Sequence, residues 1–492
     1  MLFPTTVFAV FFAVVYALHW SLPERSLARK VVLLAASVFF YCWWRCDFAA
    51  MMLASAALNH FLAKRIDAAP VPRRKKTLLA VAVTINLAAL AFFKYTGFIF
   101  TQIALPLAVP ICNAFGETDA LLDFNERTLP FVQSIVLPVG ISFYTFQAVS
   151  YVADVAWGKC RPAASYLDFA NYLSFFPKLA AGPIARPGDL LPQMEALPAR
   201  TLPIDTGRAT TLVLGGLLKK MVVANWLAGH LADPFFQFPE DYGTFDAFLG
   251  CYGYAIQIYC DFSAYSDIAT GCALLLGFKF PENFRAPYIA TSFQDFWRRW
   301  HISLSSWLRD YLYIPMGGSR CAKWKIHRNL VMTMLLGGLW HGAGWTYILW
   351  GAIHGVAQVI ERPFNKKRPK DAPPENRAVK FLRGLVTFHV VVFAWIFFRA
   401  GASDAEGLAT VRGVFSAFAN SGEPAKLFSV TALVLLASGF ALQLLDGETP
   451  RKVWAAFSRL NPCLRALIAA ILLAIVLGLG PSGVAPFIYF QF

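Results

Sequence analysis

The sequence predicts an all-α, polytopic integral membrane protein, and three observations lead to this fold class. The 492-residue chain is 57% hydrophobic and only 15% charged, whereas a soluble domain needs roughly 25% charged residues to cover its surface. Its mean hydropathy is +0.52. Windows such as 3–20, 77–100 and 464–480 run about 17 residues or more with no charge or one, which suits a bilayer-spanning helix. These features exclude a soluble enzyme, a disordered chain and a disulfide-stapled secreted module.

The net charge of +15 comes from 44 Lys and Arg against 29 Asp and Glu. Most of the basic residues lie in short loops between apolar segments, where cytoplasmic retention of Lys and Arg explains them without a nucleic-acid partner. The nine cysteines form no CxxC pair, so we expect neither disulfides nor a metal site. No basic segment precedes the apolar run 3–20, which we therefore predict to be a retained span and not a cleaved signal.

Loop charges place the first half of the chain in the membrane. Basic residues after the first span and in 64–76 are expected inside. The turn 45–47 and the segment 105–130, with four acidic residues and one arginine, are expected outside. The spans predicted between these loops are 3–20, 31–44, 48–63, 77–100 and 131–157.

The second half continues the same alternation. Residues 279–328 are expected inside, as is 361–383, which holds eight basic and three acidic residues. The spans predicted here are 210–226, 245–276, 385–398, 427–445 and 464–480. The chain therefore makes about ten full crossings of the bilayer, with both termini on the outer side.

Two apolar segments do not fit a simple span. Residues 171–190 contain Pro177, Pro183 and Pro187, and proline in a helix interior costs about 3 kcal/mol, so a re-entrant or interfacial element is expected. Residues 293–313 alternate aromatic and charged side chains at helical spacing, which predicts one amphipathic helix at the interface. His301 belongs to its inward-facing side.

A third segment, 330–360, is apolar but has basic flanks that are both assigned inside. It must enter and leave on the same side, and Gly342, Ala343 and Gly344 give the bend signal. Residues 330 to 341 span about 16 Å at the helical rise, roughly half of the ~30 Å hydrocarbon core. His341 is therefore expected near the midplane of the bilayer.

Ionisable residues inside a membrane are candidates for function because their burial is costly. His341 meets this test, and His354 lies in the returning arm. The alternative is a histidine that only packs between helices. A neutral imidazole in an apolar site can act as a base on a hydroxyl that attacks a thioester. His301 can orient the substrate or stabilise charge on the carbonyl oxygen, or it is only a polar residue at the edge of an interfacial helix.

Asp261 and Asp267 lie in or near the end of an apolar span, so they need partners there. We expect Arg298 and Arg299 to be these partners. Both a structural ion pair and a catalytic role stay open for the two aspartates. Lys219 and Lys220 are expected to snorkel or form ion pairs. No P-loop, metal triad or GxSxG segment is present in the sequence.

Five motifs resemble those of the bacterial membrane-bound O-acyltransferases, most closely the branch typified by the membrane protein of alginate O-acetylation. The motifs are LPVGISFYTFQ (137–147), PKLAAGPIARP (177–187), DFSAYSDIA (261–269), FWRRWHISLSSWLRDYLYIPMGG (296–318) and NLVMTMLLGGLWHGAGWTYILWGAIHG (329–355). Relatives of this branch act in O-acetylation of peptidoglycan and cellulose and in D-alanylation of teichoic acids. The resemblance implies one transmembrane domain over 1–492, with a motif core at about 130–360, N-terminal helices in 1–104 and C-terminal helices in 385–492.

The resemblance also implies a ring of helices around a transmembrane tunnel, with His341 as the catalytic histidine and His301 as the second functional histidine. A cytoplasmic thioester, acetyl-CoA or an acyl carrier protein, would be the donor substrate, and no cofactor would be bound. The acetyl group would pass through a periplasmic acetyltransferase partner to a polysaccharide, across the inner membrane of a bacterium. Supporting residues would be His354, Asp261, Asp267, Trp340 and Trp300. Donor phosphates would meet Arg298, Arg299, Arg320, Lys323 and Lys325.

Other classes of function stay open on the sequence. A polysaccharide flippase would also be polytopic, but repeated halves and a larger set of intramembrane charges are expected for it. A non-catalytic scaffold is the other alternative. Among acceptors, an alginate-type exopolysaccharide is preferred because its motifs match best, with peptidoglycan and cellulose as alternatives.

Overall fold

The computed structural model describes residues 1–199, 204–364, 376–401, 406–445, 448–479 and 487. These residues form helices, turns and loops and no strand. The all-α prediction is confirmed for this part of the chain.

The helices follow one another through short connections. The N-terminal part contains α1 (Thr6–Ser21), α2 (Leu27–Cys42), α3 (Cys46–Asp67), α4 (Pro72–Ile99), η1 (Phe100–Ala104), α5 (Leu105–Phe115), α6 (Thr118–Ser134), α7 (Ile141–Ala156), α8 (Tyr166–Ser174), α9 (Phe176–Leu179) and α10 (Pro187–Ala196). The middle part contains α11 (Thr206–Leu217), η2 (Leu218–Ala224), α12 (Asn225–Leu227), η3 (Ala228–Ala232), α13 (Asp233–Gln237), η4 (Pro239–Asp241), α14 (Thr244–Leu275), η5 (Pro287–Ile289), α15 (Phe293–Phe296), α16 (Ile302–Leu308) and η6 (Arg309–Tyr313). The C-terminal part contains α17 (Lys323–His341), α18 (Trp345–Glu361), α19 (Arg377–Ala400), α20 (Gly407–Ala419), α21 (Val430–Leu442), α22 (Glu448–Arg459) and α23 (Pro462–Leu479).

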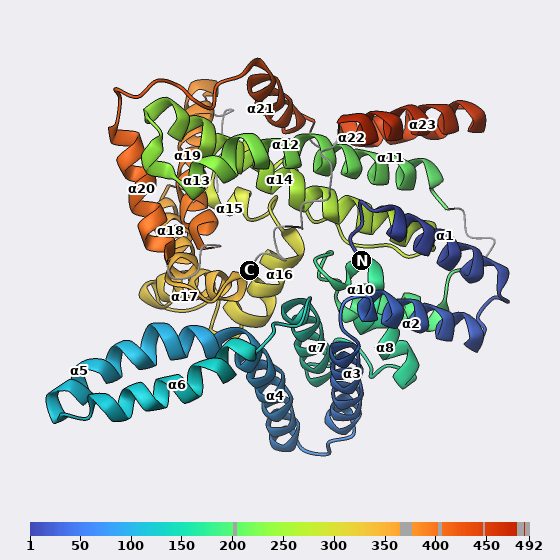
Figure 1. Cartoon of the computed structure of the whole chain (residues 1–492). Helices are drawn as coiled ribbons and strands as arrows, with labels where there is room; N and C mark the ends of the chain where they lie inside the picture. The colour runs from blue at the N-terminus through green and yellow to red at the C-terminus, as the bar shows by residue number, and fades with distance from the viewer. Residues whose placement is uncertain (200–203, 365–375, 402–405, 446–447, 480–486, 488–492) are drawn as a thin grey trace.

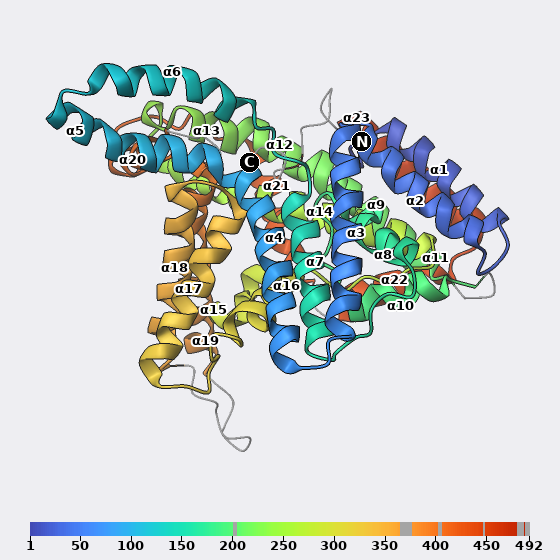
Figure 2. The same cartoon turned by 90° about the horizontal axis from the view of Figure 1, so that it is seen from below.

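The figures show how these helices are arranged. In Figure 1, α11 and α14 lie across the upper part, α17 to α20 on the left, and α3, α4 and α7 below. Figure 2 shows α3, α4, α7, α17 and α18 running side by side, whereas α5 and α6 cross one end of this group.

Local sequence explains where several helices begin. The Thr5 hydroxyl accepts a hydrogen bond from the Phe8 amide at 3.2 Å, and Ser26 caps α2 through the Arg29 amide in the same way. Such caps satisfy N–H groups that the helix itself leaves without partners. Pro72 opens α4, at the position where its missing N–H costs nothing.

The chain breaks between α6 and α7, within the predicted span 131–157. Pro138 lacks an N–H, and Gly140 takes a φ of +76°, a left-handed conformation that side chains disfavour. A Cβ on Gly140 would also lie 2.4 Å from the Leu179 carbonyl oxygen. The predicted continuous span is therefore wrong at its N-terminal end, and α7 begins at Ile141.

The proline-rich segment 171–190 is broken, as its sequence predicts. It contains the end of α8, the short α9, an irregular stretch at 180–186 and the start of α10. Nearly all of it is buried, and α8 packs against α2 and α3. Irregular backbone inside a membrane protein needs this cover of surrounding protein.

Two ion pairs join the segment after α11 to α14. Lys220 Nζ lies 2.6 Å from Asp261 Oδ1, and Lys219 Nζ lies 2.6 Å from Asp267 Oδ2. Pairing of both lysines is confirmed, whereas the predicted partners of the aspartates, Arg298 and Arg299, are wrong. The reason is proximity, because α11 and η2 pack directly along α14.

The stretch 293–313 does not form one interfacial helix, so that prediction is wrong. It divides into α15, a series of turns, α16 and η6. The interruption falls at His301, whose φ of +43° is left-handed and therefore incompatible with a continuing right-handed helix. Its aromatic side chains are mostly buried in the protein, including Phe296, Trp300 and Trp307.

Helices α17 and α18 form the predicted hairpin, with the bend at 342–344. Their backbones approach so closely that a Cβ on Gly338 would lie 2.2 Å from the Tyr347 carbonyl oxygen. A Cβ on Gly351 would lie 2.3 Å from the Met334 carbonyl oxygen. Helix α17 begins at Lys323, so His341 lies about 27 Å from its start at 1.5 Å per residue.

Among the described residues, five helices are long and apolar enough to cross a membrane. They are Cys46–Asp67, Pro72–Phe115, Thr206–Gln237, Arg377–Ala400 and Pro462–Leu479. The protein is therefore a multi-pass membrane protein. About ten crossings, the tunnel and the sides of the two termini stay predictions, and the C-terminal end and much of the loop 361–383 lie outside the described residues.

Candidate active site

His341 is the last residue of α17 and is buried. Its ring meets the rings of Trp340, Trp350 and Phe398 nearly edge to face, at centroid distances of 5.0, 5.1 and 5.2 Å. This arrangement is favourable for aromatic rings. The aromatic walls hold the imidazole in place.

The end of α17 is held by two side chains of α4. Lys94 Nζ donates hydrogen bonds to the carbonyl oxygens of Trp340 and of His341, the latter at 2.9 Å. The Tyr95 hydroxyl donates to the Leu339 carbonyl oxygen at 2.8 Å. The last carbonyls of a helix have no partners within it, and a cation is favourable there. The two side chains therefore fix the backbone that carries His341.

Sequence analysis did not single out Lys94. The signal was present, because Lys94 is the one charged residue inside the apolar window 77–100. A lone lysine in a span is a functional candidate by the same argument that selected His341.

His301 precedes α16 and is fully buried. Its Nδ1 lies 3.1 Å from Asn283 Oδ1, and its Nε2 has no hydrogen-bond partner in the part of the chain that the structure describes. The ring packs edge to face on Phe262 at 4.6 Å. Asn283 is a second residue that sequence analysis missed, since no motif marked it.

Both candidate histidines, His301 and His341, lie beside the indole ring of Trp340. The Trp340 ring lies 5.0 Å from His341 and 6.3 Å from His301. Lys94 Nζ lies 5.9 Å from the centroid of the same ring. The two histidines and Lys94 come from α17, from the turn before α16 and from α4, so the site forms only when these elements pack together.

His354 lies in α18 and is fully buried. The Trp350 ring separates it from His341, at 4.9 Å from His354 and 5.1 Å from His341. Neither nitrogen of His354 has a hydrogen-bond partner within the described residues. Trp300 packs on Trp395 at 4.9 Å and lies in the wall beside His301.

The remaining candidates lie in ion pairs or on exposed parts of the chain. Asp261 and Asp267 are held by the lysines of η2, which favours a structural role for both. Of the proposed donor-binding residues, Arg299 pairs with Asp295 at 3.0 Å. The other four have exposed side chains around the start of α17 and the turn after α15: Arg298, Arg320, Lys323 and Lys325.

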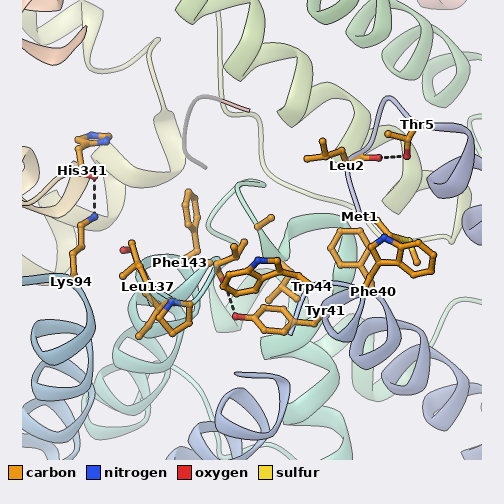
Figure 3. Close-up of a pocket in the computed structure, with 18 of the residues that line it drawn as sticks. Met1, Leu2, Thr5, Phe40, Tyr41, Trp44, Lys94, Leu137, Phe143 and His341 are labelled. Atoms are coloured by element: carbon orange, nitrogen blue, oxygen red, sulfur yellow. Dashed lines mark hydrogen bonds between the residues drawn. The ribbon is translucent and has the colours of Figure 1, made fainter. Parts of the chain in front are cut away.

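A cavity of about 640 Å³ reaches the site. Figure 3 shows His341 and Lys94 at one end of it, and Met1, Leu2 and Thr5 at the other. Its walls come from the ends of α2 and α4, the segment 137–143 and α9. A cavity of this size can hold a small ligand or an inserted peptide segment.

Residues 163–398 match the model of MBOAT, the membrane-bound O-acyltransferase family. His301, His341 and His354 all lie within the matched region. Together with the relatives below, this match shows that the chain belongs to the membrane-bound O-acyltransferase family, in the branch of alginate O-acetylation.

The relatives carry acyltransferase names. The chain is 37% identical to the probable alginate O-acetylase AlgI of Azotobacter vinelandii over all of both chains. It is 42% identical to the probable alginate O-acetylase AlgI of Pseudomonas aeruginosa, over 81% of this chain and 72% of the relative. It is also 34% identical to the peptidoglycan O-acetyltransferase of Helicobacter pylori, over 81% and 77% of the two chains. The protein is accordingly an O-acyltransferase.

Proposed function

We propose that this protein moves an acetyl group from a cytoplasmic thioester, acetyl-CoA or an acyl carrier, across the inner membrane for O-acetylation of an alginate-type exported polysaccharide. A periplasmic acetyltransferase partner makes the final transfer to the polymer. The observation that carries the proposal is the position of His341, which is buried at one end of a cavity. The alginate acceptor is supported by the names of the A. vinelandii and P. aeruginosa relatives.

The proposed chemistry is direct transfer to a hydroxyl group. The acceptor hydroxyl enters the cavity, and His341 takes its proton as the oxygen attacks the thioester carbonyl. The new C–O bond forms, the C–S bond breaks, and the leaving thiolate takes the proton from His341. A base positioned in this way contributes about 10²–10⁴-fold to the rate.

The donor approaches from the face that carries the start of α17. Arg298, Arg320, Lys323 and Lys325 are exposed there, and arginine and lysine are suited to bind phosphate groups. This face is the cytoplasmic one in the proposal, because the positive-inside rule assigns such clusters to the cytoplasm.

A second acceptor, peptidoglycan, is favoured by one observation, the 34% identity to the H. pylori peptidoglycan O-acetyltransferase. The chemistry at His341 would be the same. Only the partner and the polymer would differ.

The test is the O-acetyl content of the exported polysaccharide in a host that lacks its own homologous gene. The host is complemented with the wild type, His341→Ala or His327→Ala at matched membrane levels. His327 is a matched control, because it lies in the same helix α17, about 21 Å from His341 at the helical rise. Wild type and His327→Ala are expected to restore acetylation, and His341→Ala to reduce it at least a hundredfold.

Three outcomes would each contradict one part of the proposal. Acetylation that survives His341→Ala would remove the catalytic role of this histidine. Loss of the polymer itself from the medium would favour an export function over transfer chemistry. Acetyl groups found on peptidoglycan and absent from the polysaccharide would favour the second acceptor.

A further inference from the structure

A buried hydrogen-bond network next to His301 identifies which atom of Asn283 is its oxygen. The Ile184 amide donates to Ser303 Oγ at 3.0 Å, and Ser303 Oγ lies 2.8 Å from Asn283 Oδ1. The Ser303 amide also donates to Asn283 Oδ1, at 3.2 Å. A main-chain N–H can only donate, so the atom of Asn283 that faces it must be the carbonyl oxygen. The amide orientation of Asn283 therefore follows from its surroundings.

The same orientation satisfies the other end of the amide. Asn283 Nδ2 donates to Ser266 Oγ at 3.0 Å. His301 Nδ1 faces Asn283 Oδ1 at 3.1 Å, and this oxygen can only accept. Nδ1 must therefore carry the hydrogen. In a neutral imidazole the other nitrogen, Nε2, then bears the lone pair.

We infer that Asn283 is a positioning residue that fixes His301 in its Nδ1–H tautomer, so that Nε2 acts as a hydrogen-bond acceptor toward the substrate hydroxyl. Nε2 is buried and has no hydrogen-bond partner among the described residues, so the proposed hydrogen bond would satisfy an acceptor that these residues leave unsatisfied. The ring lies against Trp340, which also contacts His341 and lines the cavity. This inference rests on the proposed function, because it assigns the role of a residue in that reaction.

The assignment changes what His301 can do. A neutral imidazole whose Nε2 is an acceptor cannot donate a hydrogen bond to the carbonyl oxygen of the thioester. It can hold the hydroxyl of the acceptor in line for attack, while His341 removes the proton. Of the two roles that the sequence left open for His301, this one corresponds to orientation of the substrate and not to stabilisation of charge on the carbonyl oxygen.

Asn283 also holds the backbone around His301. Its main-chain oxygen accepts from the Ile302 amide at 2.9 Å, and the Arg285 amide donates to the Arg299 oxygen at 2.9 Å. These bonds support the left-handed conformation of His301, which is costly for a residue other than glycine. Since they are main-chain bonds, a side-chain substitution at 283 keeps them and removes only the side-chain contacts, which are those of Oδ1 with His301 and Ser303 and that of Nδ2 with Ser266.

The test compares Asn283→Ala with Ser266→Ala, in the complemented host and at matched membrane levels. Ser266→Ala removes one buried polar contact of the network, the one with Asn283 Nδ2. Asn283→Ala removes that contact and also the acceptor for the Ser303 amide, for the Ser303 hydroxyl and for Nδ1–H of His301. The initial rate of polysaccharide O-acetylation is expected to fall roughly 10–100-fold in Asn283→Ala, as for partners that orient other functional histidines. The rate in Ser266→Ala is expected to stay within about threefold of the wild type, a loss typical of one neutral hydrogen bond.

A locked tautomer provides a sharper readout than loss of activity. The variant combines Asn283→Ala with Nδ1-methylhistidine at position 301. The methylated ring cannot carry a hydrogen at Nδ1, so its neutral form always has the lone pair on Nε2. The methyl group occupies space left by the amide of Asn283. This variant is expected to recover at least about a third of the lost rate. No recovery, or an Asn283→Ala rate within about twofold of the wild type, would overturn the inference.

Asn283→Asp gives an independent measurement if the alanine variant does not accumulate. It keeps an oxygen opposite Nδ1, and its negative charge favours the protonated imidazole. The acid side of the pH–rate profile is then expected to move to higher pH, and an unchanged profile would overturn the inference. If the wild type transfers no acetyl group, or His341→Ala remains active, the proposed function fails instead.

Discussion

Gly338→Ala tests whether the close contact of α17 and α18 sets the position of His341. The new Cβ would lie 2.2 Å from the Tyr347 carbonyl oxygen, whereas ordinary contacts begin near 3.4 Å. The two backbones must separate by about 1 Å, and Gly338 lies one helical turn before His341. A displacement of 1 Å at a catalytic group can cost about 10² in rate. The rate of O-acetylation is therefore expected to fall roughly a hundredfold.

Gly337→Ala is the matched control. Its Cβ would meet only the end of the Leu308 side chain, at 3.2 Å, which can move aside. Both substitutions gain about 1 kcal/mol of helix propensity, so the difference between them reports the backbone contact alone. The assay is the initial rate of polysaccharide O-acetylation at equal membrane levels. Equal rates in the two variants would refute the reasoning.

Three further predictions concern single lysine and arginine side chains. Lys94→Met is expected to lower the rate of O-acetylation about tenfold, and Lys94→Arg is expected to keep part of that rate, because a cation holds the carbonyl oxygen of His341. Equal rates in the Met and Arg variants would contradict this role of Lys94. Lys220→Met removes the ion pair with Asp261 and is expected to lower the free energy of unfolding by about 3–5 kcal/mol. The measurement is the thermal unfolding temperature in detergent, which is expected to fall in Lys220→Met and to recover in part when Asp261→Asn is added. Arg320→Ala is expected to raise the apparent KM for the thioester donor several-fold without changing kcat, and a change in kcat alone would argue against donor binding.

The sequence was sufficient for the hairpin, whereas the catalytic role of His341 and its position near the midplane of the bilayer stay predictions. Charge on both sides of 330–360 required a return to the same side, and Gly342 and Gly344 marked the bend. The close contact between the two helices was not predictable, because it depends on which glycines face each other across α17 and α18, namely Gly338 and Gly351.

The sequence was insufficient where distant residues meet. Helical spacing over 293–313 predicted one helix, since periodicity carries no information about a left-handed residue such as His301. The partners of Asp261 were predicted wrongly, because the choice among arginines and lysines depends on how α11 and α14 pack. Asn283 was missed because its contact with His301 joins residues 18 positions apart in an irregular segment.

The ion pairs between η2 and α14 also bear on how the chain enters the membrane. A lysine at the centre of a span costs about 2.5–3.5 kcal/mol on insertion, and Lys219 and Lys220 are adjacent. The carboxylate that meets Lys219 lies 48 residues later in the chain, in a helix that is synthesised after the first. The two helices are therefore expected to insert as a neutral pair, so that the first waits at the translocon until the second arrives.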